Sequence, residues 1–109
     1  MALRQIIGGG FQDLSGNPIG LGYMTLRLSS DAVVSGIQIS SGIITRASLD
    51  ASGNISGTVL FWPNDQMVPS NTVYIVKVYN ANGELCWQSQ QTIPSGTGSF
   101  DIGSWVPVF

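Results

Sequence analysis

The chain has 109 residues, of which 43% are hydrophobic and only 9% are charged, and its formal net charge is −2. Its four basic residues are scattered along the sequence, without the cluster of cations that nucleic-acid binding requires, so we expect no nucleic acid among its partners. The usual charged share is about 25%, and a surface this poor in charge repels its neighbours weakly, so we expect a homo-oligomer or a subunit packed against other proteins.

Short apolar or alternating stretches separated by frequent turn residues predict an all-β fold. Tyr23–Ser29 alternates cleanly, and Thr72–Tyr79 is rich in the β-branched and aromatic residues that strands favour. Seven or eight such strands within a length typical of one domain predict a single antiparallel β-sandwich over residues 1–109. The predicted strands are Ile6–Gln12, Tyr23–Ser29, Val33–Ile39, Ile43–Leu49, Ile55–Trp62, Thr72–Tyr79, Glu84–Thr92 and Ser99–Trp105.

Two turns share the pattern Asp-x-Ser-Gly-Asn, at residues 13–17 and 50–54, and residues 80–84 are a third variant. A short acidic loop with glycine resembles part of a calcium loop. Calcium requires several converging carboxylates, whereas each of the two patterned loops brings only one. We therefore interpret them as turns in which Asp or Asn caps its own backbone and Gly supplies a positive φ.

Targeting and membrane signals are absent from the sequence. The first ten residues lack the apolar core of a signal peptide, because three glycines follow Ile6 and Ile7. No apolar run approaches the roughly 20 residues of a spanning helix, and no basic amphipathic stretch suits a membrane surface. We expect no membrane association, and synthesis in a cytoplasm without export by that route.

The residue types that most enzymes need are missing or dispersed. The chain has no His, which removes the commonest general base, and a single Cys, so we expect no metal site, no cofactor and no catalytic residues. Carboxylates from distant turns could still meet in space as in a glycosidase. Cys86, flanked by Leu85 and Trp87, is predicted to be a half-buried strand thiol. The glycines at 8–10 are interpreted as a bulged entry to the first strand.

Two predicted strands are apolar on both faces. Leu60 and Trp62 point away from Phe61, and Tyr79 lies on the opposite face from Val78. A two-layer sandwich buries one face of each strand, so the other face needs cover from a partner or a loop. Trp87 fits the position between the sheets.

The C-terminal stretch 104–109 is nearly all apolar, although chain ends are usually polar. It either docks on its own domain or reaches a neighbouring subunit. The candidate interface or ligand residues are Leu60, Trp62, Tyr79, Trp105, Val106, Val108 and Phe109.

Five segments together resemble the Ig-like or fibronectin-type β-sandwich modules of bacteriophage virion proteins. The segments are Gly10–Ile19, Gly22–Leu28, Leu49–Ile55, Phe61–Asp65 and Thr72–Asn80. The resemblance implies an Ig-like sandwich of about 7–8 short strands and a place in a tail fibre, baseplate or capsid surface, usually as an oligomer and often near host glycans. The chain begins with Met and carries no fibre, which favours a stand-alone virion component over a fibre tip.

Three functions follow as hypotheses. The first is a non-enzymatic virion structural or assembly protein, made in the bacterial host cytoplasm, that self-associates or docks on other virion proteins. The second is a carbohydrate-binding module that holds a host glycan on exposed aromatic side chains such as Trp62 or Trp105. The third is a generic Ig-like adhesion or scaffold domain.

Overall fold

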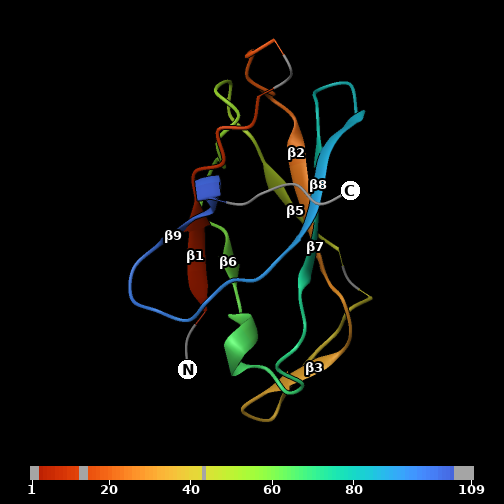
Figure 1. Cartoon of the computed structure of the whole chain (residues 1–109), viewed down its shortest axis with the longest axis vertical. Helices are drawn as coiled ribbons and strands as arrows, with labels where there is room; N and C mark the ends of the chain where they lie inside the picture. Colours follow the sequence, from red (N-terminus) through yellow and green to blue (C-terminus); the bar gives the residue numbers. More distant parts are fainter. Residues whose placement is uncertain (1–2, 13–14, 43, 105–109) are drawn as a thin grey trace.

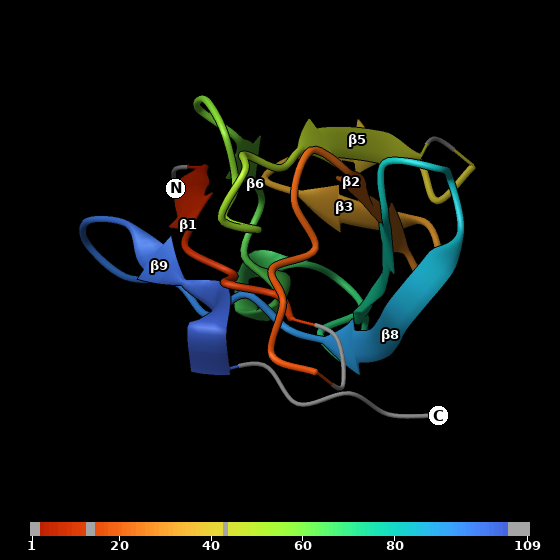
Figure 2. The same cartoon turned by 90° about the horizontal axis from the view of Figure 1, so that it is seen from above.

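Two sheets face each other around one hydrophobic core in the computed structural model, which describes residues 3–12, 15–42 and 44–104 (Figures 1 and 2). The predicted all-β sandwich is therefore confirmed. One sheet has the order β6 (Leu60–Phe61), β1 (Arg4–Ile7), β9 (Phe100–Asp101). The other has the order β5 (Thr45–Ser48), β2 (Tyr23–Leu28), β7 (Tyr74–Tyr79), β8 (Leu85–Gln91).

The remaining elements are short. A hairpin of β3 (Ala32–Val34) and β4 (Ile37–Ile39) lies at one end of the molecule, and two single-turn 3-10 helices, η1 (Asn64–Gln66) and η2 (Ile102–Ser104), follow β6 and β9 (Figure 1). Neither helix in the described ranges has the length and apolar character that crossing a membrane would require. The strand pairs are antiparallel except β1 with β9, which is parallel.

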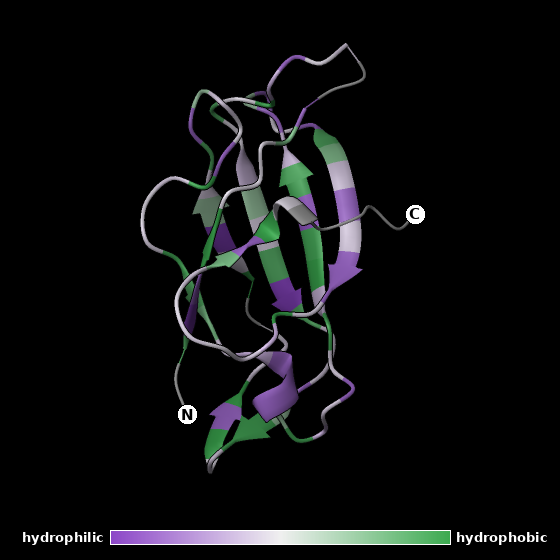
Figure 3. Ribbon diagram, turned by 60° about the vertical axis from the view of Figure 1, so that its left-hand side comes forward, coloured by the Kyte–Doolittle hydropathy of each residue, from purple (hydrophilic) through white to green (hydrophobic). Residues whose placement is uncertain are grey.

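The core is built on the central pair of strands, β2 and β7. Their antiparallel register sets Met24 opposite Val78 and Leu26 opposite Val76, and all four side chains are buried. Residues directly opposite on one face pack closely, and burying each such side chain contributes roughly 1.5–3 kcal/mol. Figure 3 shows hydrophobic residues recurring along these strands, whereas the edge strand β8 is largely hydrophilic.

The predicted strand Ile6–Gln12 is wrong, because the strand there is β1 and it precedes the three glycines. Gly8, Gly9 and Gly10 all have positive φ, at 83°, 112° and 60°. A strand needs negative φ, and only glycine adopts positive values freely. The glycines therefore end the first strand instead of leading into it.

The predicted strand Val33–Ile39 is split in two. Ser35 and Gly36 both have positive φ, at 47° and 82°, and form the turn of the β3–β4 hairpin. Positive φ at both central residues is the mark of a type I′ hairpin turn.

Three other predicted strands also have different bounds. In the predicted strand Ile55–Trp62 only the two residues of β6 are paired as a strand. The predicted strand Ile43–Leu49 is reduced to β5, with Ile43 outside the described residues. The predicted strand Ser99–Trp105 is replaced by β9 and η2, and Trp105 lies outside the described residues.

Cys86 is exposed, not half-buried as predicted. The register between β7 and β8 shifts there, because Val78 pairs with Trp87 while Tyr79 pairs with Leu85. Cys86 is the extra residue of this β-bulge and has no partner on β7. An alternation read along the sequence does not reveal such an insertion.

The turns at 50–54 and 80–84 have the same hydrogen bonds. Asp50 Oδ1 accepts from the N–H groups of Ser52 and Asn54, and Asn80 Oδ1 accepts from those of Asn82 and Glu84. In both turns the fourth residue is a glycine with φ near 80° whose N–H donates to the first carbonyl. The predicted turn chemistry is confirmed at both places. Of the turn at 13–17, Asp13 lies outside the described residues.

Asn64 in η1 is a buried polar residue, 2% exposed, that joins three segments. Its Oδ1 accepts from the Ile93 N–H at 2.8 Å, and its Nδ2 donates to Thr72 Oγ1 at 3.3 Å. Its backbone N–H also donates to the Ile93 carbonyl. A buried polar group is stable only when its hydrogen bonds are satisfied, and here the side chain fixes η1 against the segments after β8 and before β7.

We predict that Asn64→Ala lowers the free energy of unfolding by about 2–3 kcal/mol, because it removes two hydrogen bonds and leaves the buried Ile93 N–H without a side-chain acceptor. Urea unfolding followed by tryptophan fluorescence measures the change. Asn71→Ala is the control, since Asn71 is exposed and its replacement should change stability by less than about 0.5 kcal/mol. Equal effects of the two substitutions would contradict the role of Asn64.

Candidate functional site

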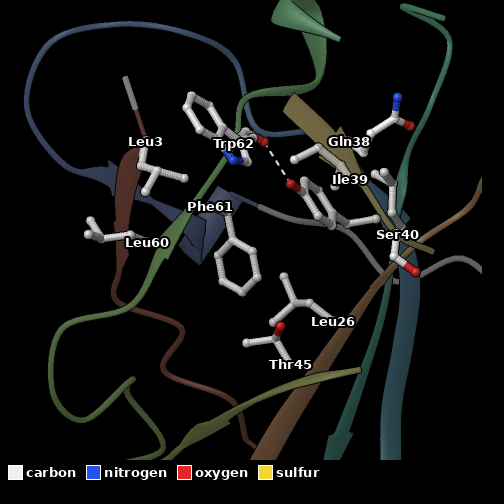
Figure 4. A pocket seen from close by; sticks show the side chains of 11 residues that line it. Leu3, Leu26, Gln38, Ile39, Ser40, Thr45, Leu60, Phe61 and Trp62 are labelled. Atoms are coloured by element: carbon white, nitrogen blue, oxygen red, sulfur yellow. Dashed lines mark hydrogen bonds between the residues drawn. The ribbon is translucent and has the colours of Figure 1, made fainter. Parts of the chain in front are cut away.

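An apolar groove of about 340 Å³ opens between the two sheets at β5 and β6, each the outermost strand of its sheet (Figure 4). Its floor consists of buried core residues, among them Leu26 and Phe61. Phe61 points toward Leu26 and Thr45 across the gap between the sheets. The groove therefore gives direct access to the hydrophobic core.

The exposed rim of the groove continues onto the outer face of β1 and β6. Gln5 is paired with Leu60, and the two-residue period of a strand places Leu3 and Ile7 on the same face as Gln5. Leu3, Ile7 and Leu60 are exposed by 43%, 40% and 49%. We call Leu3, Ile7 and Leu60 the outer apolar patch. Leu3 and Leu60 also line the groove, so the patch adjoins it. Exposed apolar surface of this kind marks protein interfaces.

Two aromatic side chains pack together at β8, the edge strand farthest from β5 in its sheet. The rings of Phe11 and Trp87 lie 5.1 Å apart between centroids, and Phe11 is buried. Trp87 is half-buried and packs against the core, which fits the position predicted for it between the sheets. Aromatic rings thus pack against the core at β8, whereas the groove opens between the sheets at β5 and β6.

The backbone of Trp62 is held in place by a hydrogen bond from Tyr74. The Tyr74 hydroxyl donates a hydrogen bond of 2.6 Å to the Trp62 carbonyl, which fixes the chain just after β6 (Figure 4). The Tyr74 ring also lies edge-on to Phe61, with 5.5 Å between centroids. Burial raises the pKa of Tyr74 above its ordinary value, since the low-dielectric surroundings disfavour the phenolate. Trp62 is half-buried, so its indole is not a fully open platform.

Tyr74→Phe tests this anchor through pH. An unfolded tyrosine ionises near 10.0, whereas the folded Tyr74 with its raised pKa stays neutral, so its contribution to stability is complete below pH 10 and is lost as pH rises above that value. We expect Tyr74→Phe to cost about 1 kcal/mol at pH 7, through loss of the hydrogen bond, and to reduce the fall in stability between pH 10 and 11.

Denaturant midpoints measured from pH 7 to 11 provide the readout. Tyr23→Phe is the control, because it leaves Tyr74 in place and should keep the full alkaline loss. If both variants lose stability with the same slope above pH 10, Tyr74 does not dominate the alkaline titration.

The far wall of the groove comes from the β3–β4 hairpin, whose Gln38, Ile39 and Ser40 line it beside Thr45. The hairpin is held by backbone hydrogen bonds between Val33 and Val68. Its end is held by Asp31 Oδ1, which accepts from the backbone N–H and the hydroxyl of Ser41, both at 2.8 Å. These bonds hold the pKa of the Asp31 carboxyl below its ordinary value. The groove has a polar side at Gln38, Ser40 and Thr45, and an apolar side formed by β6 and the residues next to it.

The predicted interface residues fall into three places. Leu60 and Trp62 line the groove together with Phe61, whereas Tyr79 lies on the outer face of the other sheet. Trp105, Val106, Val108 and Phe109 lie outside the described residues. Ile39 and Tyr74 were not predicted as site residues, because they reach the groove from elements distant in sequence and nothing in their own segments marks them.

Three of the four basic residues are clustered in space although they are scattered in sequence, so the prediction that the chain has no cluster of cations is wrong. Thr25 on β2 is paired with Arg46 on one side and with Lys77 on the other, and Arg27 lies two residues along the same face. Three of the chain's four cations therefore share the outer face of one sheet. Only the strand order brings them together.

Within the described residues, no group of three or more His, Cys, Asp or Glu side chains is placed to hold a metal ion. In comparisons with known proteins, no family model matches this chain, and no curated protein matches it.

Proposed function

We propose that this protein is a non-enzymatic structural protein of a bacteriophage virion that self-associates or docks on neighbouring virion subunits through the groove and the outer apolar patch. The observation that carries the proposal is the continuity of exposed Leu3 and Leu60 with a groove that reaches the core. Exposing this surface has a free-energy cost of roughly 25 cal/mol per Å² of apolar area. A partner that covers it recovers that free energy, and the low surface charge opposes contact only weakly.

We further propose that the occupant of the groove is the 105–109 segment of a second copy. Its sequence, Trp-Val-Pro-Val-Phe, has no charged side chain and suits an apolar floor. Five extended residues span about 17 Å, a length on the scale of a strand. The groove is flanked by β5 and β6, whose outer edges have no neighbouring strand among the described residues. An extended segment placed there can add main-chain hydrogen bonds to side-chain burial, and a proline is tolerated at such an edge.

Leu60→Asp tests the groove. We expect the substitution to reduce the mass of the oligomer, because a carboxylate at the rim must be desolvated when the partner docks. The control is Leu85→Asp on β8, since Leu85 and Leu60 are both 49% exposed but Leu85 lies on the far edge of the other sheet. Multi-angle light scattering gives the mass, and circular dichroism shows that both variants are folded. A monomeric parent protein, or an unchanged mass for Leu60→Asp, would overturn the proposal.

Removal of residues 105–109 tests the occupant. A chain that ends at Ser104 should remain folded and should have the lower mass of the Leu60→Asp variant. A full-length variant with Ser in place of Trp105, Val106, Val108 and Phe109 should behave in the same way, which separates chemistry from length. If Leu60→Asp dissociates the oligomer and the shortened chain does not, the groove is an interface with a different occupant.

A further inference from the structure

A second surface, on the outer face of the sheet β5-β2-β7-β8, has a different chemistry from the groove. Arg46, Thr25, Lys77 and Gln88 form one row across the four strands, as the pairs Thr25–Arg46, Thr25–Lys77 and Lys77–Gln88 show. Arg27 lies in the next row, opposite Ile75. On this protein of net charge −2, three of the four basic residues are thus concentrated on one face.

The face is hollowed beside two of these cations. A depression of about 180 Å³ is lined by Thr25, Arg27, Ile44, Ile75, Lys77 and Tyr79. It offers a guanidinium and an ammonium for an anion, two hydroxyl groups for hydrogen bonds, and isoleucine side chains as an apolar wall. Arg is suited to hold a carboxylate through two parallel hydrogen bonds.

The described carboxylates accept hydrogen bonds from groups in loops and turns. Asp31 accepts hydrogen bonds from Ser41, and Asp65 accepts them from Ser95. The other three are bonded within their own turns: Asp50 at 50–54, Glu84 with Asn80, and Asp101 with the Gly103 N–H. None of these bonds involves Arg27, Arg46 or Lys77, so the face can attract an external anion.

The two tyrosines on this face stack on each other rather than on a ligand. Tyr23 and Tyr79 are 4.8 Å apart between ring centroids at an interplanar angle of 20°, and the Arg46 guanidinium lies 3.7 Å from the Tyr23 centroid. Both faces of the Tyr23 ring are thus covered. Proteins that bind single-stranded nucleic acid stack bases on open aromatic faces, and Tyr23 cannot provide one. The hydroxyl and amide groups of the surface suit a polyhydroxylated ligand better than a base.

We propose that this outer face binds an acidic polysaccharide, with the carboxylate of one uronic acid residue held between Arg27 and Lys77. The hydroxyls of Thr25 and Tyr79 bond the hydroxyls of that sugar, and Ile75 contacts its C–H face. Gln88, opposite Lys77, extends the polar row toward the next sugar. This site is separate from the groove and does not depend on self-association.

Calorimetry with an oligogalacturonate tests the proposal. We expect binding at low salt that weakens as salt is raised, because exposed charges are screened within about 10 Å at 0.1 M. A maltooligosaccharide of the same length, which lacks the carboxylates, should not bind. Lys77→Gln should weaken binding about tenfold, which corresponds to the loss of one charge-assisted contact. Lys77→Arg is the matched control and should bind about as tightly as the parent.

Three outcomes would overturn the site. The first is no binding of oligogalacturonate, and the second is equal binding by the Gln and Arg variants. The third is equally tight binding of an oligothymidylate of the same charge, which would make the face a general or nucleic-acid anion site. The Leu60→Asp variant should bind oligogalacturonate as the parent does, so failure of the assembly proposal and failure of this one can be told apart.

Discussion

The antiparallel register between β2 and β7 is the constraint on which the rest of the molecule depends. Because side chains alternate across a sheet, a shift of one residue would move every side chain of β2 to the other face. The observed register pairs Leu26 with Val76 in the core and, at the same time, Thr25 with Lys77 outside. Core packing therefore also fixes where the cations lie. As long as the buried side chains hold this register, the residues of the outer face stay in their positions, and no interaction among the outer residues is needed.

Strand β5 places the two surfaces next to each other. Its pairing with β2 sets Thr45 opposite Leu26, where it lines the groove, and Arg46 opposite Thr25, where it covers the Tyr23 ring. Two consecutive residues thus belong to surfaces of opposite character. A subunit held by neighbours at the groove would still present its cationic face outward, since the two point to opposite sides of one strand.

Local chemistry was predictable from the sequence, and long-range placement was not. The alternation of Met24, Leu26 and Leu28 gave the buried face of β2, and the turn at 50–54 followed from its Asp and Gly. The bulge at Cys86 was missed because an inserted residue leaves no mark in composition. The clustering of Arg27, Arg46 and Lys77 was not predicted because it depends on the order of the strands in the sheet. The groove was not predicted because it depends on how the two sheets pack against each other. Leu60 and Trp62, predicted from the apolar residues on both faces of their strand, line the groove.

The turn at 80–84 is closed by hydrogen bonds among its own residues, from the Asn80 side chain and between the backbones of Asn80, Gly83 and Glu84. Ala81 and Asn82 at its tip are exposed. The connection between β7 and β8 therefore depends on these hydrogen bonds and not on which side chains stand at positions 81 and 82. This makes the tip a site where evolution can exchange side chains without disturbing the sheet. The same property makes Ala81 a suitable position for a substituted residue that carries a spectroscopic label.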